Sequence, residues 1–238
     1  MLVAGFPAGP FGTNCWILAP GPRCEAVIVD PGMDSRAGIQ QVIAEQGLQP
    51  VAVLLSHGHL DHMWSVLPVC NGYDIPALIH PADRALLTDP WAAVAAETRL
   101  AFAQMVGAAT FAEPSEVREL VDGEVLDLAG LTFVADHAPG HTPGSTAFRM
   151  MDTGAEPLML SGDLLFAGSI GRTDLPGGDH AAMLESLRRV VLSQPDEMIV
   201  LPGHGQTTTI GSERRSNPYL QGLGAASAGP GSDGGRRR

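Results

Sequence analysis

A dense group of potential metal ligands lies in the segment 57–62, which reads HGHLDH. His57 and His59 are two positions apart, so both imidazoles can point to the same side of an extended segment. Asp61 and His62 follow where the chain can turn into a short helix, and their side chains diverge there. One metal ion could therefore take the first two histidines while a second takes the aspartate and the last histidine. Imidazole and carboxylate ligands suit zinc, iron or manganese.

A simpler interpretation of this segment is an exposed polar loop whose histidines only form hydrogen bonds. A lone histidine would favour that interpretation, but three histidines and an aspartate within six residues favour a metal site. The preceding run 51–55 is apolar, rich in branched residues and too short for a helix, so it predicts a buried strand. The histidines then follow a strand end, where sheets commonly display functional residues.

Three further ligand candidates each come directly after a predicted strand. They are His141, Asp163 and His204. A glycine precedes each of them, and glycine lets the backbone approach a crowded site and adopt unusual dihedral angles. Together with the first segment, they bring seven candidate ligands to strand ends on one side of a pair of sheets.

The rest of the pattern predicts two sheets packed face to face with helices outside them. Helices are expected after Ser35 as an N-cap, from Pro81, after Asp179 as an N-cap over 180–192, and over 210–216. Short apolar runs between glycines and prolines predict strands at 2–6, 15–18, 26–29, 77–80, 125–128, 131–138, 145–150, 157–160 and 198–201.

Composition excludes several classes of protein. The chain has 238 residues, is 45% hydrophobic and carries a net charge of −12. It therefore has enough apolar residues for a sizeable core, and it lacks the positive surface that nucleic-acid binding requires. Cys15, Cys24 and Cys70 form no CxxC pair and indicate reduced thiols, which favours a cytoplasmic location. The N-terminal stretch has neither the basic region of a signal peptide nor the length of a membrane anchor, so no membrane association is expected.

The order of the seven candidates along the chain resembles the metallo-β-lactamase superfamily, and the resemblance covers nearly all of residues 1–220. It implies an α+β fold, the four-layer αββα sandwich. It also implies two divalent metal ions, with Zn²⁺ expected first and Fe or Mn as alternatives. Within that family one metal is held by three histidines, here His57, His59 and His141. The second is held by Asp61, His62 and His204, and Asp163 bridges the two.

Two stretches resemble the glyoxalase II-like hydrolases of that superfamily, and the compact single-domain members most closely. They are 162–166 (GDLLF) and 168–174 (GSIGRTD), and 201–205 (LPGHG) with 207–217 strengthens the likeness. The implied activity is hydrolysis of a small acyl thioester, as in a hydroxyacylglutathione hydrolase, with Asp61 and Asp163 as catalytic residues. The helical region with which the larger enzymes grip glutathione is absent, so the thiol half of the substrate stays open. Arg172 is expected either to hold a substrate carboxylate or to form an ion pair with Asp174.

Other activities of this superfamily compete with the thioesterase. An iron-dependent persulfide dioxygenase shares the fold and would use a single iron at His57, His141 and Asp163. Retention of all seven candidates permits two metals without requiring them. A β-lactamase is less favoured because no export signal is visible, and a nuclease is disfavoured by the acidic balance.

The remaining expectations concern organisation. Residues 1–221 should form one catalytic domain, and the Gly-, Ala- and Ser-rich stretch 222–238 should be a disordered tail. The apolar stretch 88–116 predicts one or two helices that either cover the mouth of the site as a lid or simply pack on the core. Three histidines outside the ligand set are expected to be structural, His80, His137 and His180. The oligomeric state is left open.

Overall fold

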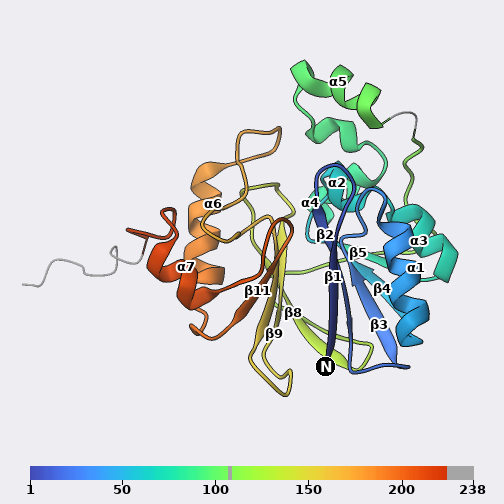
Figure 1. The fold of residues 1–238 in the computed structure, drawn as a ribbon. Coiled ribbons are helices and arrows are strands. Elements are labelled where there is room, and N and C mark those ends of the chain that lie inside the picture. The colour runs from blue at the N-terminus through green and yellow to red at the C-terminus, as the bar shows by residue number, and fades with distance from the viewer. Residues whose placement is uncertain (107–108, 224–238) are drawn as a thin grey trace, which may run out of the picture.

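Two mixed six-stranded sheets pack face to face at the centre of the protein, and helices cover their outer faces (Figure 1). The computed structural model describes residues 1–106 and 109–223. The expected four-layer αββα sandwich is confirmed. The stretch expected to be a disordered tail lies, from residue 224, outside the described residues. Within the described part, no helix is both long enough and apolar enough to cross a membrane.

The first sheet uses the N-terminal half of the chain in sequential strand order. Its strands are β1 (Leu2–Ala8), β2 (Thr13–Ala19), β3 (Glu25–Val29), β4 (Gln49–Leu54), β5 (Ala77–Ile79) and β6 (Val117–Glu119). β1, β2 and β3 pair antiparallel as a meander, whereas β3 to β6 pair parallel. The parallel strands therefore all end at one edge of the sheet, where the loops that follow them lie side by side.

The second sheet uses the C-terminal half, again in sequential order. Its strands are β7 (Glu124–Leu128), β8 (Leu131–His137), β9 (Thr146–Met150), β10 (Leu158–Gly162), β11 (Ile199–Pro202) and β12 (Thr208–Thr209). β9 runs antiparallel to both β8 and β10, and β11 runs parallel to β10. The carboxyl ends of β8, β10 and β11 consequently lie at the same edge.

Helices complete the outer layers. α1 (Ser35–Gln46) and α3 (Val66–Tyr73) lie outside the first sheet, and α6 (His180–Ser186) and α7 (Ile210–Ser216) lie outside the second (Figure 1). The shorter segments are α2 (Leu60–Met63), α4 (Pro81–Arg84), the 3₁₀ turns η1 (Ala85–Leu87) and η2 (Pro90–Ala93), and α5 (Ala96–Val106). α6 continues into a π-helical stretch, η3 (Leu187–Val191).

Central strands such as β2 and β10 are buried on both faces, which explains their continuous apolar runs, whereas the edge strand β1 alternates with exposed residues. Neighbouring side chains alternate between two clusters, because successive residues of a strand point to opposite faces. In β2, Leu18 packs between the sheets while Ile17 packs under the outer helices. In β10, Leu160 faces the first sheet and Met159 faces α6 and η3. The core thus has three apolar layers, which together hold the strand ends rigidly in place.

One local expectation was wrong in part, and one helix was not predicted. Ser35 is the first residue of α1 rather than its N-cap, a position that Asp34 occupies with a φ of 59° and without a capping hydrogen bond. α3 was not predicted, because Pro68 and Gly72 within it are poor helix formers, although its buried residues Val66, Val69 and Cys70 have helical spacing. By contrast, the Asp179 cap is confirmed, since its Oδ1 accepts a hydrogen bond from the Ala182 amide at 3.0 Å.

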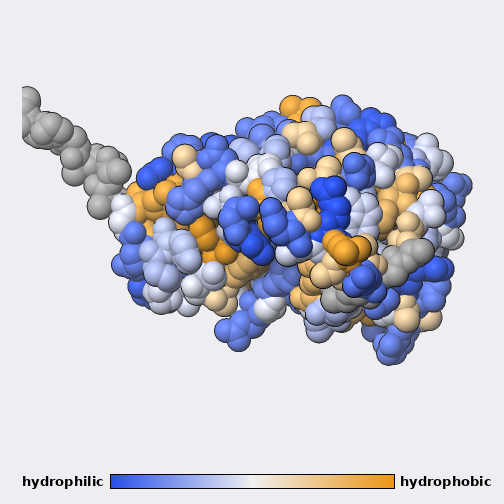
Figure 2. Space-filling view, turned by 90° about the horizontal axis from the view of Figure 1, so that it is seen from above, coloured by the Kyte–Doolittle hydropathy of each residue, from blue (hydrophilic) through white to orange (hydrophobic). Residues whose placement is uncertain are grey.

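Some apolar residues of the stretch 88–116 pack in the core, and others lie at the end of the sandwich. Phe111 packs against Trp64, with ring centroids 5.2 Å apart, and belongs to the layer under the outer helices of the first sheet. Phe102, in α5, instead stacks on Phe11 of the β1–β2 turn, with centroids 5.1 Å apart and planes within 14°. α5 projects from the end of the sandwich, and Leu100 on its surface is 71% exposed. Figure 2 looks onto this end, where apolar side chains gather in several separate groups among hydrophilic ones.

His80 and His137 join the two sheets outside the candidate ligand set. Their rings stack with centroids 3.9 Å apart, His80 following β5 and His137 ending β8. Burial and, secondly, the neighbouring His137 lower the pKa of His80, although Asp83, Asp122 and Glu119 act in the opposite direction. A histidine whose pKa is lower in the folded state than in the unfolded state costs stability as pH falls through its ordinary value near 6.5.

Replacing His80 with asparagine should therefore make the protein less sensitive to mild acid. Asparagine can still cap α4 by accepting from the Ala82 amide, as His80 Nδ1 does. Between pH 7.5 and 5.5 the metal-saturated His80→Asn variant should lose less melting temperature than the wild type. His180→Asn, at an exposed histidine on α6, is the matched control and should behave as the wild type. Equal losses in all three proteins would contradict the prediction.

Candidate metal centre

All seven ligand candidates lie together at one end of the sandwich. Four come from the first sheet, in the loop after β4 and in α2. The other three follow β8, β10 and β11 of the second sheet. Their ligand atoms form three overlapping groups within which every pair lies within 4.8 Å: His57, His59 and His141; His57, His62 and Asp163; Asp61, His62 and His204.

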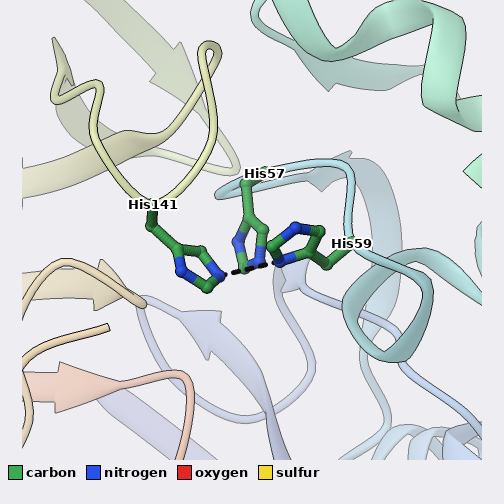
Figure 3. A group of neighbouring side chains, drawn as sticks. All are labelled: His57, His59 and His141. Atoms are coloured by element: carbon green, nitrogen blue, oxygen red, sulfur yellow. Dashed lines mark hydrogen bonds between the residues drawn. The ribbon is translucent and has the colours of Figure 1, made fainter. Parts of the chain in front are cut away.

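The three-histidine group unites both sheets. The rings of His57, His59 and His141 point toward one another, the first two from the loop after β4 and the third from the loop after β8 (Figure 3). His59 Nδ1 and His141 Nε2 are 2.8 Å apart. All three side chains are buried, and Nε2 of both His57 and His59 lacks a hydrogen-bond partner. Buried nitrogens without partners are costly unless something else binds in the group.

The group of Asp61, His62 and His204, called the second group below, pairs two histidines with a carboxylate. Asp61 Oδ2 lies 3.5 Å from His62 Nε2 and 3.2 Å from His204 Nε2, and the two nitrogens are 3.2 Å apart. Asp163 stands between this group and the first. Its Oδ1 is 3.3 Å from His62 Nε2, and its Oδ2 is 3.3 Å from His141 Nε2. This is the position in which a carboxylate can serve both groups.

The spacing and chemistry of these atoms fit transition-metal ions. Two ligand atoms on a tetrahedral zinc with bonds of about 2.05 Å are about 3.3 Å apart. The closest contacts between candidate atoms run from 2.8 to 3.7 Å, which brackets that value, and all pairs within a group lie within 4.8 Å. Asp163 Oδ1 is also buried without a hydrogen-bond partner. The donor set of imidazoles and carboxylates therefore fits two ions, with Asp163 able to face both.

Electrostatics divides the histidines into two kinds. Burial, then the neighbouring His62, lowers the pKa of His57 far below its ordinary value. Burial, then His141, lowers the pKa of His59 to about 3. Both rings are therefore neutral at pH 7, the form in which imidazole binds a metal.

The two histidines nearest the carboxylates, His62 and His204, instead have raised pKa values. Burial alone would lower the pKa of His62, but the Asp163 and Asp61 carboxylates outweigh it and raise that pKa well above its ordinary value. For His204, burial is likewise outweighed by the hydrogen bond to Asp61, which raises its pKa. Burial would raise the pKa of both carboxyl groups, but the charge of His62 outweighs it and lowers both. Asp61 and Asp163 are thus ionised acceptors, as metal ligands must be.

A set of orienting groups was missed from the sequence. Four rings use Nδ1 to contact a fixed partner, which leaves Nε2 for the centre: His57 with Ser56 Oγ, His62 with Asp30 Oδ2, His141 with the Arg172 carbonyl, and His204 with the Phe11 carbonyl. Thr13 also donates from Oγ1 to Asp61 Oδ2 at 2.8 Å. Such contacts fix the tautomer and angle of a ligand. Asp30 follows β3, the strand beside β4, and that adjacency was the available signal.

Close backbone approach explains one glycine of the centre. A Cβ on Gly203 would overlap Asp163 Oδ1 and lie 2.6 Å from His62 Cε1. Only glycine therefore fits beside the ligand atoms at the end of β11.

Arg172 lies at the edge of the centre rather than within it. Its guanidinium forms hydrogen bonds with Asp174 at 2.6 and 2.7 Å, so the ion pair considered from the sequence is present. The side chain is largely exposed and also lines a pocket beside His59 and Asp61. The role in substrate binding stays a prediction. None of the described contacts places His80, His137 or His180 among the ligand groups.

Comparison with known proteins identifies the class. The family model of the metallo-beta-lactamase superfamily matches residues 8–204, and the chain belongs to this superfamily. The hydroxyacylglutathione hydrolase GloC of Haemophilus influenzae is 34% identical over 220 residues, covering 90% of this chain and 95% of that protein.

Two solved structures share both fold and sequence. The B3 metallo-beta-lactamase BLEG-1 is 38% identical with a TM-score of 0.80, over 93% of this chain and all of that one. TTHA1623, solved in a di-iron-bound form, is 38% identical with a TM-score of 0.74, over 92% of this chain and all of that one. The chain is thus similar to proteins named for a thioesterase, for a β-lactamase and for a pair of iron ions.

Proposed function

We propose that this protein hydrolyses a small acyl thioester of the S-2-hydroxyacyl-thiol type, using two divalent metal ions. The observation that carries the proposal is the small pocket beside His59 and Asp61, which has a volume of about 180 Å³. Pockets for drug-sized ligands commonly measure about 300–1,000 Å³, so this one suits an acyl group and leaves the thiol outside. The likeness to GloC supports the same substrate class.

The walls of the pocket suit a short acyl chain with a polar substituent. Val94, Phe102 and Leu175 supply apolar surface, and Thr98 and Arg172 supply polar groups. A short alkyl group would contact the apolar side, and a hydroxyl or carbonyl oxygen would face the polar side. Arg172 would orient the substrate from the loop that follows Asp163.

The residues of the centre divide the work of hydrolysis. His57, His59 and His141 would hold one ion, and Asp61, His62 and His204 the other. Bound dications of this kind lower the pKa of coordinated water from 15.7 to about 7 and polarise a carbonyl oxygen. Asp163, whose buried Oδ1 has no other partner, faces both groups and can accept a hydrogen bond from the attacking water. A thiolate leaves without a strong general acid, since a free cysteine thiol has a pKa of about 8.5.

The test compares three substrates on the same purified protein loaded with zinc, manganese or iron. We expect S-lactoylglutathione, or the same acyl group on a smaller thiol, to be cleaved with release of free thiol and without oxygen consumption. Glutathione persulfide in an oxygen electrode tests the dioxygenase, and a chromogenic β-lactam tests the lactamase. Oxygen uptake with the persulfide by iron-loaded protein, together with intact thioesters under every metal, would overturn the proposal.

The pocket also yields a prediction for α5 as a lid. Phe102 lines the pocket and is held by the stack on Phe11, whose carbonyl contacts His204. Because an aromatic stack contributes about 0.5–1.5 kcal/mol, Phe102→Ala should raise KM about 2- to 10-fold. The same energy corresponds to at most about 1–6 °C in melting temperature, so the change in KM is the deciding measurement. Leu100→Ala, on the exposed side of α5, should leave KM unchanged.

The opposite pattern would support the core-packing interpretation of this stretch. In that case Phe102→Ala would lower the melting temperature by several degrees and leave KM as in the wild type. Trp91, the other large aromatic residue near the start of this stretch, lies in η2 and does not line the pocket.

A further inference from the structure

A buried carboxylate outside the ligand set connects the two loops that carry the three-histidine group. Asp83, in α4, is fully buried. Its Oδ2 accepts from the Gly58 amide at 2.9 Å and from Thr142 Oγ1 at 2.7 Å. Its Oδ1 accepts from the Gly144 amide at 2.7 Å. One side chain thus binds both loops at once.

These contacts fall directly beside metal-ligand candidates. Gly58 is the residue between His57 and His59, in the loop that follows the first sheet's β4. Thr142 is the residue after His141, in the loop that follows the second sheet's β8. Asp83 therefore spans the boundary between the two sheets at the point where the three histidines must converge.

The surroundings of Asp83 are built for a carboxylate. Because the Thr142 hydroxyl donates to Asp83, the Ser145 hydroxyl, 2.7 Å away, donates to Thr142 Oγ1, while Ser145 Oγ accepts from the Thr142 amide at 3.1 Å. A Cβ on Gly144 would lie 2.6 Å from Asp83 Cγ, so only glycine permits this close approach. Three donors meet an acceptor-only group, and hydrogen bonds to a charged acceptor are short and strong.

We propose that Asp83 is a positioning residue that sets the separation of His59 and His141, and through it the metal affinity of the three-histidine group. An asparagine would keep the shape but turn an NH₂ group toward one of the three donors. One loop would then move away from the other. The second group would be spared, because its histidines are held by Asp30 and by the Phe11 carbonyl instead. This inference concerns metal binding, so it does not depend on which substrate the protein cleaves.

The experiment is a competition titration of metal-free Asp83→Asn with Zn²⁺ against a chromogenic chelator. Removal of a group that orients metal ligands typically lowers metal affinity about 10- to 100-fold. We expect a decrease of this size in the step that binds one of the two Zn²⁺ ions and not in the step that binds the other. Asp89→Asn, at an exposed aspartate six residues further on, is the matched control and should titrate as the wild type. Thr13→Val, which removes the hydrogen bond to Asp61 Oδ2 at constant shape, should weaken the other step, and this identifies the two groups.

The melting temperature of the metal-free protein separates positioning from general stability. A merely structural Asp83 would lower that temperature and weaken both steps equally, and this result would overturn the proposal. Binding within about twofold of the wild type in both steps would overturn it as well. If Asp83→Asn does not fold, Thr142→Val removes one of the three hydrogen bonds at constant shape. It should weaken the same step by a smaller factor, and an unchanged titration would reject the proposal.

Discussion

Replacing Asp163 with alanine should lower kcat by at least about 100-fold, because losing a group that only orients a ligand already costs about 10- to 100-fold. Asp163 faces both metal-ligand groups, at 3.3 Å from His62 and from His141, and no other carboxylate of the described chain occupies that position. Its removal should leave each group three ligands or fewer and no common one. Turnover with saturating metal, together with metal content per chain, measures the effect.

The fold should survive this change. Asp163 lies at the end of β10 beyond the apolar layers, so the far-ultraviolet circular dichroism of the metal-free variant should match the wild type. Asp152→Ala, at an exposed aspartate after β9, is the matched control and should retain full turnover. Turnover of Asp163→Ala above a tenth of the wild-type value would refute the assigned role.

Removing the metal should have the second large effect. Binding to the folded state alone stabilises it by about 4 kcal/mol at a free metal concentration a thousand times the dissociation constant. For a protein of this size, about 1 kcal/mol corresponds to about 2–4 °C in melting temperature. Each ion should therefore contribute about 8–16 °C, so a chelated sample should melt at least that far below a zinc-saturated one and should lack hydrolase activity.

Re-addition of metal distinguishes this effect from irreversible damage. Both the melting temperature and the activity should return when zinc or manganese is restored. A melting temperature indifferent to chelator, in a sample shown by elemental analysis to be free of metal, would contradict the two-metal centre. Saturation below one ion per chain would contradict it too.

The candidate ligands could be predicted because the signal is local. Four of them lie within six residues, and each of the others combines a strand end with an adjacent glycine. The αββα fold followed from the family resemblance and agreed with the order of apolar runs. Whether these residues bind metal as proposed is what the titrations above decide.

The groups that orient the ligands could not be predicted in this way. Asp30 accepts a hydrogen bond from Ser56, which is 26 residues away in the sequence, and Asp83 accepts one from Gly144, which is 61 residues away. A single aspartate after a strand or within a short helix has no distinguishing local pattern. Its importance arises only when the sheets bring distant loops together. The residues of the pocket wall could not be predicted either. No local sequence pattern indicates that Phe102 stacks on Phe11 while Phe111 packs in the core.

The division of the chain between the sheets has a consequence for biosynthesis. The first sheet uses residues 2–119 and the second uses 124–209, and each three-residue metal group draws members from both. A ribosome produces the first sheet first, so a growing chain displays the HGHLDH segment long before His204 exists. At that stage each ion would find only two of its three ligands, and no bridging carboxylate. The three-histidine group would be complete once β8 and His141 are made, and the other group only once β11 has brought His204 into place. Loading of both ions would therefore require that both sheets have been made and have docked.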